Sequence, residues 1–198
     1  MEYTLIAPCY FGTESVLNYE IKKIGGRDID VSDGRIVFKG DENTIAAANI
    51  NLRTAERVLI LLKEFKATDF DRLFDGVFSI DWKSILPLDA EFPVKGSSLS
   101  STLSSVPACQ KIIKKSIVEK MRKQYRESIL PENGDLYKIR FSIRKDIVSI
   151  MLDTSGDGLH KRGYRRNSGE APIKETLAAA IVDLARIRDD SLVQDPFC

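Results

Sequence analysis

The Asp33-Gly34 pair constrains the fold of this chain more than any other feature of its sequence. It separates two short segments, residues 28–31 and residues 35–40. Asp-Gly between two such segments is typical of a β-hairpin, because the central residues of the tight turn need a positive φ. We therefore expect two antiparallel strands here, around which the rest of the N-terminal segment is arranged.

The elements that flank this hairpin form a known order. Residues 3–8 and residues 57–62 each have the pattern of a buried strand. An amphipathic helix is expected from Gly12-Thr13-Glu14 to Gly25-Gly26, and a second helix from about Asp41 into the fifties. The order β-α-β-β-α-β is that of a ferredoxin-like domain. The sequence therefore predicts an α+β fold for this part of the chain.

A second unit of helices and strands follows. We expect residues 69–74 to start a helix, with Asp69 at its N-terminus, and residues 91–96 to form a strand. A Ser-rich loop at 97–106 and a helix at 107–126 follow. After a turn at 131–135 we expect two strands, at 136–144 and 147–153, joined by a turn at Lys145-Asp146. This mixture of short strands and separate helices again indicates an α+β arrangement.

The C-terminal part has a different character. Residues 155–169 are Gly-rich and basic and have no hydrophobic period, which is typical of a linker or a docking loop. Pro172 is expected to open a last helix, whose run at 177–182 is apolar on nearly every side and should be deeply buried. Residues 191–198 have the pattern of a strand and the start of a loop. Nothing after them can cover the helix, so we expect the chain to be truncated before a further domain.

The net charge of the chain is +1, but its charges are unevenly divided. Residues 94–166 hold 16 Lys and Arg against 7 Asp and Glu, a net charge of +9, and the remainder carries −8. A concentrated basic segment indicates a polyanionic partner, which an even distribution would not.

Composition excludes several other classes of protein. The 198 residues are 43% hydrophobic, so neither disorder nor a collagen-like repeat is expected. No apolar run approaches the ~20 residues of a membrane span, and the N-terminus lacks the pattern of a signal peptide. Cys9, Cys109 and Cys198 have no metal-ligand spacing, and we expect free thiols in a cytoplasmic protein.

The helix expected at 107–126 places its basic residues on one side. At 100° per residue, an arc of about 120° contains Lys111, Lys114, Lys115, Arg122 and Arg126. Val118 lies within this arc, and a solvated helix face is the simpler interpretation. Further basic clusters in the same +9 segment, at 138–140, 144–145 and 161–166, favour phosphate neutralisation by a nucleic-acid-binding surface instead.

The sequence offers no recognisable catalytic site. His160 is the one histidine and has no identifiable carboxylate partner, so a surface or structural role is expected. Cys9 and Cys109 are expected to pack as small apolar residues, and Asp157 to lie in a turn. We find no nucleophile elbow, phosphate-binding loop or metal-ligand cluster, and we predict no bound metal.

Two segments resemble a known family. They are Leu152–Arg165 (LDTSGDGLHKRGYR) and Ala171–Ile181 (APIKETLAAAI), with Asp-Pro-Phe-Cys following at 195–198. Together they resemble the THUMP-containing RNA guanine-N2 methyltransferases, most closely the bacterial 23S ribosomal RNA group. The resemblance covers essentially the whole chain, and its motifs are most specific after residue 151.

The resemblance implies a particular division of the chain. It implies a ferredoxin-like domain at 1–65, a THUMP RNA-binding domain at 66–155, a basic linker at 156–170, and the truncated start of a Rossmann-like methyltransferase domain at 171–198. In this family Asp-Pro-Phe/Met-Cys leads into the glycine loop that binds S-adenosylmethionine, and that loop is absent here. We therefore expect no catalytic residue and no complete cofactor site within these 198 residues.

The resemblance also implies site residues. The cofactor-binding candidates are Pro172, Thr176, Asp195 and Pro196. The linker residues Lys161, Arg162 and Arg165 match a basic linker that is expected to face RNA, and the basic face of the helix at 107–126 lies where a THUMP domain would bind RNA. From the spacing of the basic residues we take as further RNA-binding candidates the five basic residues of that helix, together with Lys95 and Arg140 on the expected strands.

The implied function is the RNA-binding part of a methyltransferase that uses S-adenosylmethionine. Its substrate would be a guanine N2 amine in 23S rRNA, flipped out of its helix. A tRNA guanine-N2 methyltransferase has the same architecture and stays open. A THUMP adaptor without catalysis is a further alternative, although an adaptor has no use for half of a cofactor motif. The sequence does not indicate an oligomeric state.

Overall fold

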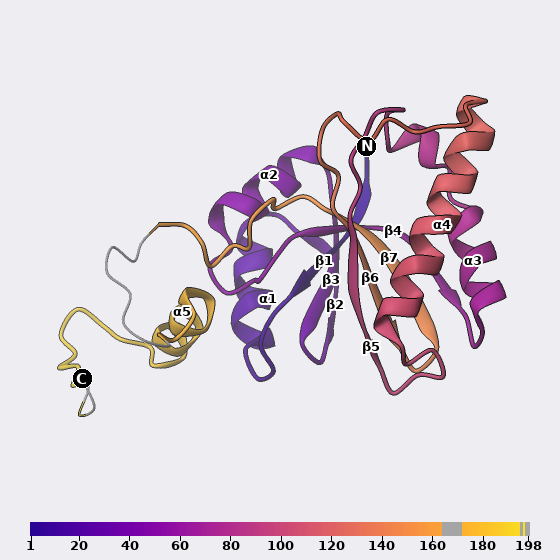
Figure 1. Cartoon of the computed structure of the whole chain (residues 1–198). Coiled ribbons are helices and arrows are strands. Elements are labelled where there is room, and N and C mark those ends of the chain that lie inside the picture. The colour runs from indigo at the N-terminus through magenta and orange to yellow at the C-terminus, as the bar shows by residue number, and fades with distance from the viewer. Residues whose placement is uncertain (164–171, 195, 197–198) are drawn as a thin grey trace. The chain divides into compact units, whose positions relative to one another are not determined.

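The computed structural model (Figure 1) describes residues 1–163, 172–194 and 196. The chain forms two compact units that alternate along the sequence. Unit 1 comprises Met1–Val58 together with Thr154–Cys198, and unit 2 comprises Leu59–Asp153. Unit 2 is therefore inserted into unit 1 in the chain order.

Unit 1 begins with a three-stranded antiparallel sheet and two helices. The strands lie in the order β2 (Arg27–Ser32), β3 (Arg35–Gly40), β1 (Tyr3–Pro8), and the helices are α1 (Glu14–Lys23) and α2 (Glu42–Asn51). Both helices contact β3. The order and types of these elements confirm the prediction made from the sequence.

Local sequence signals explain why these elements begin and end where they do. Gly34 adopts a φ of +73° in the turn between β2 and β3, where a residue with a side chain would be strained and would meet the ring of Phe11. The Asp41 side chain accepts a hydrogen bond from the Thr44 N–H at 2.9 Å. This N-cap starts α2 at the predicted residue.

Unit 2 is a four-stranded sheet with two helices on one face. The strands lie in the order β4 (Leu59–Lys66), β7 (Ile147–Asp153), β6 (Ile139–Arg144), β5 (Val94–Leu99). Neighbours are antiparallel except β5 and β6, which are parallel because a crossover containing α4 (Val106–Tyr125) joins them. The second helix is α3 (Phe70–Phe78), followed by the short 3₁₀ turn η1 (Trp82–Ser84).

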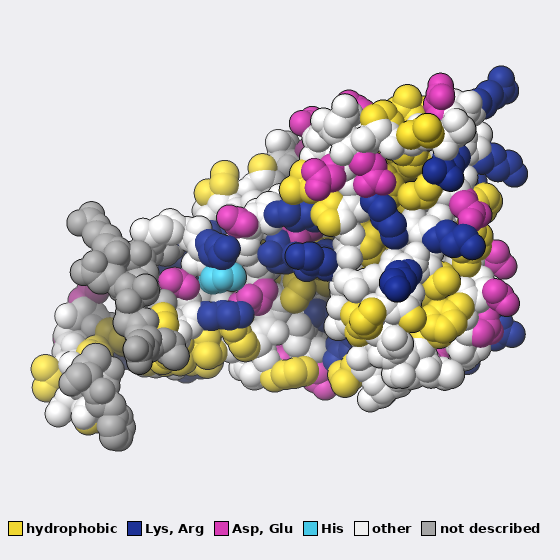
Figure 2. Space-filling view, viewed as in Figure 1, with side chains coloured by type: hydrophobic (Ala, Val, Ile, Leu, Met, Phe, Trp, Pro, Cys, Tyr) yellow, Lys and Arg dark blue, Asp and Glu magenta, His cyan; other side chains and the backbone are white. Residues whose placement is uncertain are grey.

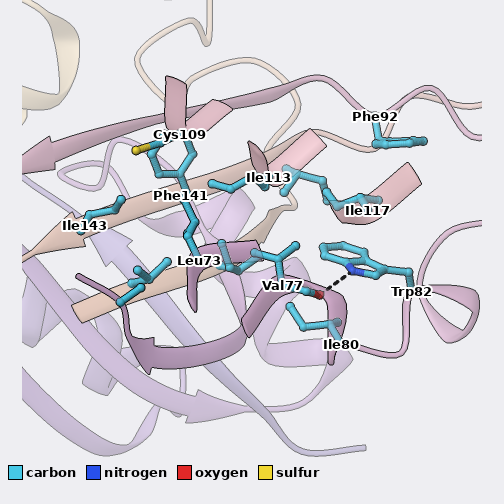
Figure 3. Close-up of a cluster of buried hydrophobic side chains, with 14 of the residues drawn as sticks. Leu73, Val77, Ile80, Trp82, Phe92, Cys109, Ile113, Ile117, Phe141 and Ile143 are labelled. Atoms are coloured by element: carbon cyan, nitrogen blue, oxygen red, sulfur yellow. Dashed lines mark hydrogen bonds between the residues drawn. The ribbon is translucent and has the colours of Figure 1, made fainter. Parts of the chain in front are cut away.

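The core of unit 2 lies between these helices and the sheet, as Figure 3 shows. Leu73 and Val77 of α3 pack with Ile113 and Ile117 of α4 against Phe141 of β6. Trp82 closes one side of the cluster and is fully buried. Its indole Nε1–H donates to the Val77 carbonyl oxygen at 3.0 Å, which satisfies the one polar atom of this side chain.

Two predicted boundaries in unit 2 are confirmed by their local geometry. Asp69 caps α3 by accepting the Arg72 N–H at 2.8 Å. Lys145 and Asp146 form the turn between β6 and β7, and both have a positive φ, 50° and 62°.

Three strands differ in extent from the prediction, because pairing partners rather than apolar runs set their ends. β4 was expected at 57–62 but runs on to Lys66, since its alternating charged residues pair with β7. β5 was expected to end at Gly96, yet the first residues of the Ser-rich segment continue it beside β6. β6 begins at Ile139 instead of Leu136, which forms only an isolated bridge to Glu91.

The C-terminal part differs more from expectation. Helix α5 (Glu175–Leu184) begins three residues after Pro172. Its expected deep burial is wrong, since only Thr176 and Ala180 are buried and Val182 is 55% exposed. The strand expected from residue 191 is also wrong for residues 191–194, which are irregular and exposed.

Among the described residues, no helix is both long and apolar enough to cross a membrane.

Candidate nucleic-acid interface

Helix α4 carries a ridge of cations directed to solvent. Lys111, Lys115 and Arg122 are all exposed and lie on the side of α4 that faces away from the core. No described residue pairs with the side chains of Lys111 and Arg122. Lys115 has two weak partners: Glu119, one turn along the helix at 3.7 Å, and the ring of Phe74, whose centre lies 5.9 Å from the ammonium. We call these three residues the α4 ridge.

The α4 sequence explains why the ridge faces outward. Cys109, Ile113, Ile117 and Met121 are fully buried and recur at helical spacing, which fixes the opposite side of the helix against the core. Arg126, a further predicted RNA contact, occupies the C-cap of α4 with a φ of 61° and is exposed. A cation there also stabilises the negative end of the helix dipole.

Lys114 is separated from the ridge by its own contacts. Its ammonium lies 2.6 Å from a carboxylate oxygen of Glu132 and 3.3 Å from the carbonyl oxygen of Phe92. It also lies 3.6 Å from the centre of the Phe92 ring. Lys114 therefore links α4 to Phe92, which precedes β5, and to Glu132, which lies in the loop before β6.

Beside the ridge lies an open groove of about 480 Å³. It runs between α4 and the start of β5, and Pro93, Val94, Gln110, Lys111, Lys114 and Lys115 line it. Lys95, the predicted contact on β5, is exposed, and no described residue pairs with its side chain. β5 is an edge strand of unit 2, so Lys95 lies at the rim of the sheet.

Arg140 has a structural partner within unit 2. Its Nε lies 3.2 Å from a carboxylate oxygen of Asp153, whose side chain is fully buried. Removing the arginine would take a cation away from a buried carboxylate, which is costly. The ion pair therefore explains Arg140 without a nucleic acid.

The linker candidates belong to unit 1. Lys161 is exposed, whereas the Arg162 guanidinium donates to the carbonyl oxygens of Asn49, Ile50 and Leu52 at 2.7–2.8 Å. Arg165 lies outside the described residues.

The cofactor candidates are only partly brought together. Pro172 and Pro196 are exposed, and Asp195 lies outside the described residues. Thr176 is buried, and its hydroxyl donates to Glu56 at 2.5 Å. The described residues of this set therefore present no free polar group from which a cofactor site can be built.

Residue types are mixed on the surface that Figure 2 shows. Lys and Arg side chains lie there singly or in small groups among Asp, Glu and hydrophobic side chains. The single histidine, cyan in the figure, lies among charged side chains. Its Nδ1 is 3.8 Å from Glu56, a residue that we did not select from the sequence. Glu56 was missed because its partners lie up to 120 positions away.

The cysteine thiols show no sign of a catalytic role. Burial raises the pKa of the Cys9 thiol to about 11, which keeps it protonated and unreactive at neutral pH. Cys9 and Cys109 are both free thiols. No cluster of metal-ligating side chains occurs among the described residues.

Three family models match the chain in sequence order. They are the RlmL ferredoxin-like domain at residues 4–59, the THUMP domain at 67–153, and the RMKL-like methyltransferase domain at 162–198. This order defines the class: a THUMP domain preceded by a ferredoxin-like domain and followed by a segment that matches a methyltransferase domain. The chain belongs to the THUMP-containing RNA methyltransferase family.

Three similar proteins are each described as a methyltransferase or a methylase. The chain is 47% identical, over its whole length, to the putative RNA methyltransferase YpsC of Bacillus subtilis. A predicted N6-adenine-specific DNA methylase from Listeria monocytogenes is 49% identical over 93% of the chain, with a TM-score of 0.87. SMU.472, a putative methyltransferase solved with SAH, is 44% identical over 96%, with a TM-score of 0.86. The chain spans 51%, 48% and 50% of these three proteins, respectively.

Proposed function

We propose that this chain is the RNA-recognition part of a methyltransferase that transfers a methyl group from S-adenosylmethionine to the N2 amine of a guanine in 23S rRNA. The α4 ridge is the observation that carries the RNA-binding part of this proposal. It places three exposed cations on one side of a helix within the segment that matches a THUMP domain.

The spacing of the ridge suits a nucleic-acid backbone. With a rise of 1.5 Å per residue, Lys115 lies about 6 Å beyond Lys111 along the helix axis, and Arg122 lies about 10 Å further. Cations at such intervals can each meet a different phosphate. Lys95 extends the set to the edge of the sheet. We leave out Lys114, Arg140 and Arg162 because their charged groups already have internal partners.

Contacts of this kind give affinity without reading sequence. Lysine and arginine at phosphates release counterions, so binding weakens steeply as salt rises. Recognition would therefore depend on the shape of a folded RNA, as is usual for A-form helices. Choice of the target nucleotide would rest with the methyltransferase domain.

The cofactor part rests on the family. The methyltransferase model matches residues 162–198, and the relative SMU.472 was solved with SAH, the product form of S-adenosylmethionine. Pro172, Thr176, Asp195 and Pro196 would border that site. The Thr176 hydroxyl is already hydrogen-bonded to Glu56.

Two other substrates have specific support. A tRNA guanine fits the same architecture, and the name of the Listeria relative supports adenine N6 in DNA. The ridge favours neither, because both are polyanions.

The test is methylation by the full-length protein, with labelled S-adenosylmethionine and three separate substrates: 23S rRNA, total tRNA and duplex DNA. Digestion to nucleosides then identifies the product. N2-methylguanosine from 23S rRNA is the expected result. The same nucleoside from tRNA alone would support the tRNA alternative and overturn the rRNA assignment, and N6-methyladenine from DNA would overturn the RNA proposal. RNA binding without methylation of any substrate would favour the adaptor alternative.

A further inference from the structure

The segment expected to be a linker is attached to unit 1 along much of its described length. Thr154 donates its hydroxyl to the Val58 carbonyl oxygen at 2.8 Å. The Asn49 side chain donates to Thr154 Oγ1 at 3.0 Å and accepts from Ser155 Oγ at 2.7 Å. Arg57 donates to the Gly156 carbonyl oxygen at 3.0 Å. These bonds hold the segment against α2 and the residues that precede β4.

Arg162 continues this attachment at the end of α2. Its NH2 group donates to the carbonyl oxygens of Asn49 and Leu52, and its NH1 group donates to that of Ile50. Carbonyls in the last turn of a helix have no partner within the helix, and they carry its negative partial charge. The last turn of α2 contains no basic residue of its own. Arg162 therefore supplies, from 110–113 positions away, both donors and charge to this terminus.

Glu56 provides a second attachment to unit 1, at Lys174 and Thr176, which follow the residues outside the described part of the chain. One of its carboxylate oxygens accepts the Thr176 hydroxyl, and the other lies 3.7 Å from the Lys174 ammonium. The Tyr10 side chain and the Glu56 carboxylate raise the pKa of Lys174, in agreement with an ammonium that has found partners. The Glu56 backbone is itself fixed, because its N–H donates to Pro8 and its carbonyl oxygen accepts from Leu159.

We propose that Arg162 and Glu56 are positioning residues, with which the ferredoxin-like domain fixes where the methyltransferase segment begins. Arg162 lies at the start of the matched methyltransferase segment and Thr176 lies in the first turn of α5. The ferredoxin-like domain would thereby position the catalytic domain. The inference rests on the proposed methyl transfer.

The proposal separates Arg162 from the RNA contacts. An RNA contact needs donors that face solvent, whereas three of the donors of Arg162 are bound to helix carbonyls. Its loss should misplace the catalytic domain while leaving RNA affinity intact. Small misplacements are costly in catalysis, since an error of about 1 Å can lower the rate by about 100-fold.

The experiment compares Arg162→Ala, Arg162→Lys, Glu56→Gln and a control in the full-length protein. The control is Arg188→Ala, which removes an exposed arginine of the same unit. Hydrogen exchange over residues 154–184, RNA affinity, and kcat and KM for methyl transfer are measured for each. For Arg162→Ala and Glu56→Gln we expect faster exchange, RNA affinity within about twofold of wild type, and a kcat lowered about tenfold or more. Arg162→Lys should recover part of the protection, because lysine keeps the charge but not the planar fork.

Three outcomes would overturn the proposal. Unchanged exchange would show that the two side chains hold nothing in place. Faster exchange with an unchanged kcat would make the contacts merely structural. Weaker RNA binding by Arg162→Ala, with unchanged exchange, would make Arg162 an RNA contact. Wild-type protein that methylates no nucleic acid would overturn the proposed function instead, and the exchange data alone would then decide whether the anchors hold.

Discussion

Lys114 and Glu132 form an ion pair in which the ammonium nitrogen lies 2.6 Å from a carboxylate oxygen, directly above the ring of Phe92. The pair joins the middle of α4 to the loop that precedes β6. It also distinguishes Lys114 from Lys111, which lies three positions earlier on the same predicted basic arc. Periodicity alone treats the two residues as equivalent.

Lys114→Met should therefore destabilise unit 2 by about 1–2 kcal/mol, the sum expected for a partly exposed ion pair and a cation–π contact. Urea denaturation measures this free energy of unfolding. Lys111→Met, the matched control, should leave stability unchanged and should weaken RNA binding more than Lys114→Met does. The reverse order for either measurement would contradict the separation of the two lysines.

Charge reversal of the α4 ridge should abolish RNA binding. The variant combines Lys111→Glu, Lys115→Glu and Arg122→Glu. Neutral glutamine versions of the same three residues should lower the slope of log K against log salt by about 2–3, since each lost phosphate contact removes ~0.7–0.9. Filter binding or fluorescence anisotropy across a salt series measures both effects.

The control for charge is a triple glutamine variant in unit 1, at Lys22, Lys23 and Arg27, which are all exposed. It changes the net charge by the same amount at a distant position in the sequence. Equal losses of affinity in the two triple variants would show that overall charge, rather than the ridge, controls binding.

Trp82→Phe should lower the stability of unit 2 by about 1–3 kcal/mol. The smaller ring leaves space in a fully buried site, and the Val77 carbonyl oxygen loses its indole donor. Thermal or urea unfolding followed by circular dichroism measures the loss, since this variant also removes the one tryptophan. Ile129→Ala, at a position that is 74% exposed, should change stability by less than about 0.5 kcal/mol.

Unit 1 should lose stability in acid through Glu14. Hydrogen bonds from backbone N–H groups, that of Gly34 foremost, hold the pKa of this carboxyl below its usual range. Because the folded state binds the proton less readily than the unfolded state, the stabilisation is complete above the ordinary pKa of about 4.3 and is lost as pH falls through the lower folded pKa.

Glu14→Gln tests this dependence. At neutral pH the variant should be less stable than wild type, and the difference should shrink as pH falls below about 4. Urea midpoints between pH 3 and pH 6 measure it. A stability difference that stays constant across this range would contradict the assignment to the Glu14 carboxylate.

Much of the fold was predictable because its signals are local. Asp33-Gly34 specifies a hairpin within four residues, and Asp41 and Asp69 each cap the helix that follows them. The strand ends were less predictable. The charged end of β4 resembles a loop until its partner, β7, is known, and that partner lies more than 80 residues away.

The site was predictable as a surface but not residue by residue. Periodicity placed Lys111, Lys115 and Arg122 on the outer side of α4. It could not show that Lys114 meets Glu132, because that contact depends on where the chain returns after the helix. Arg162 illustrates the same limit, since a basic residue in a glycine-rich segment has the same appearance whether it binds a phosphate or a helix terminus.

Leu59 and Asp153 are partners in the β4–β7 ladder, so the chain enters and leaves unit 2 at neighbouring positions. This arrangement sets an order of events during synthesis. The ribosome has to deliver all of residues 59–153 before Thr154 can reach Val58 or Arg162 can reach the end of α2. The first domain to emerge is therefore completed after unit 2. Unit 2 can finish folding before the final contacts of unit 1 have formed.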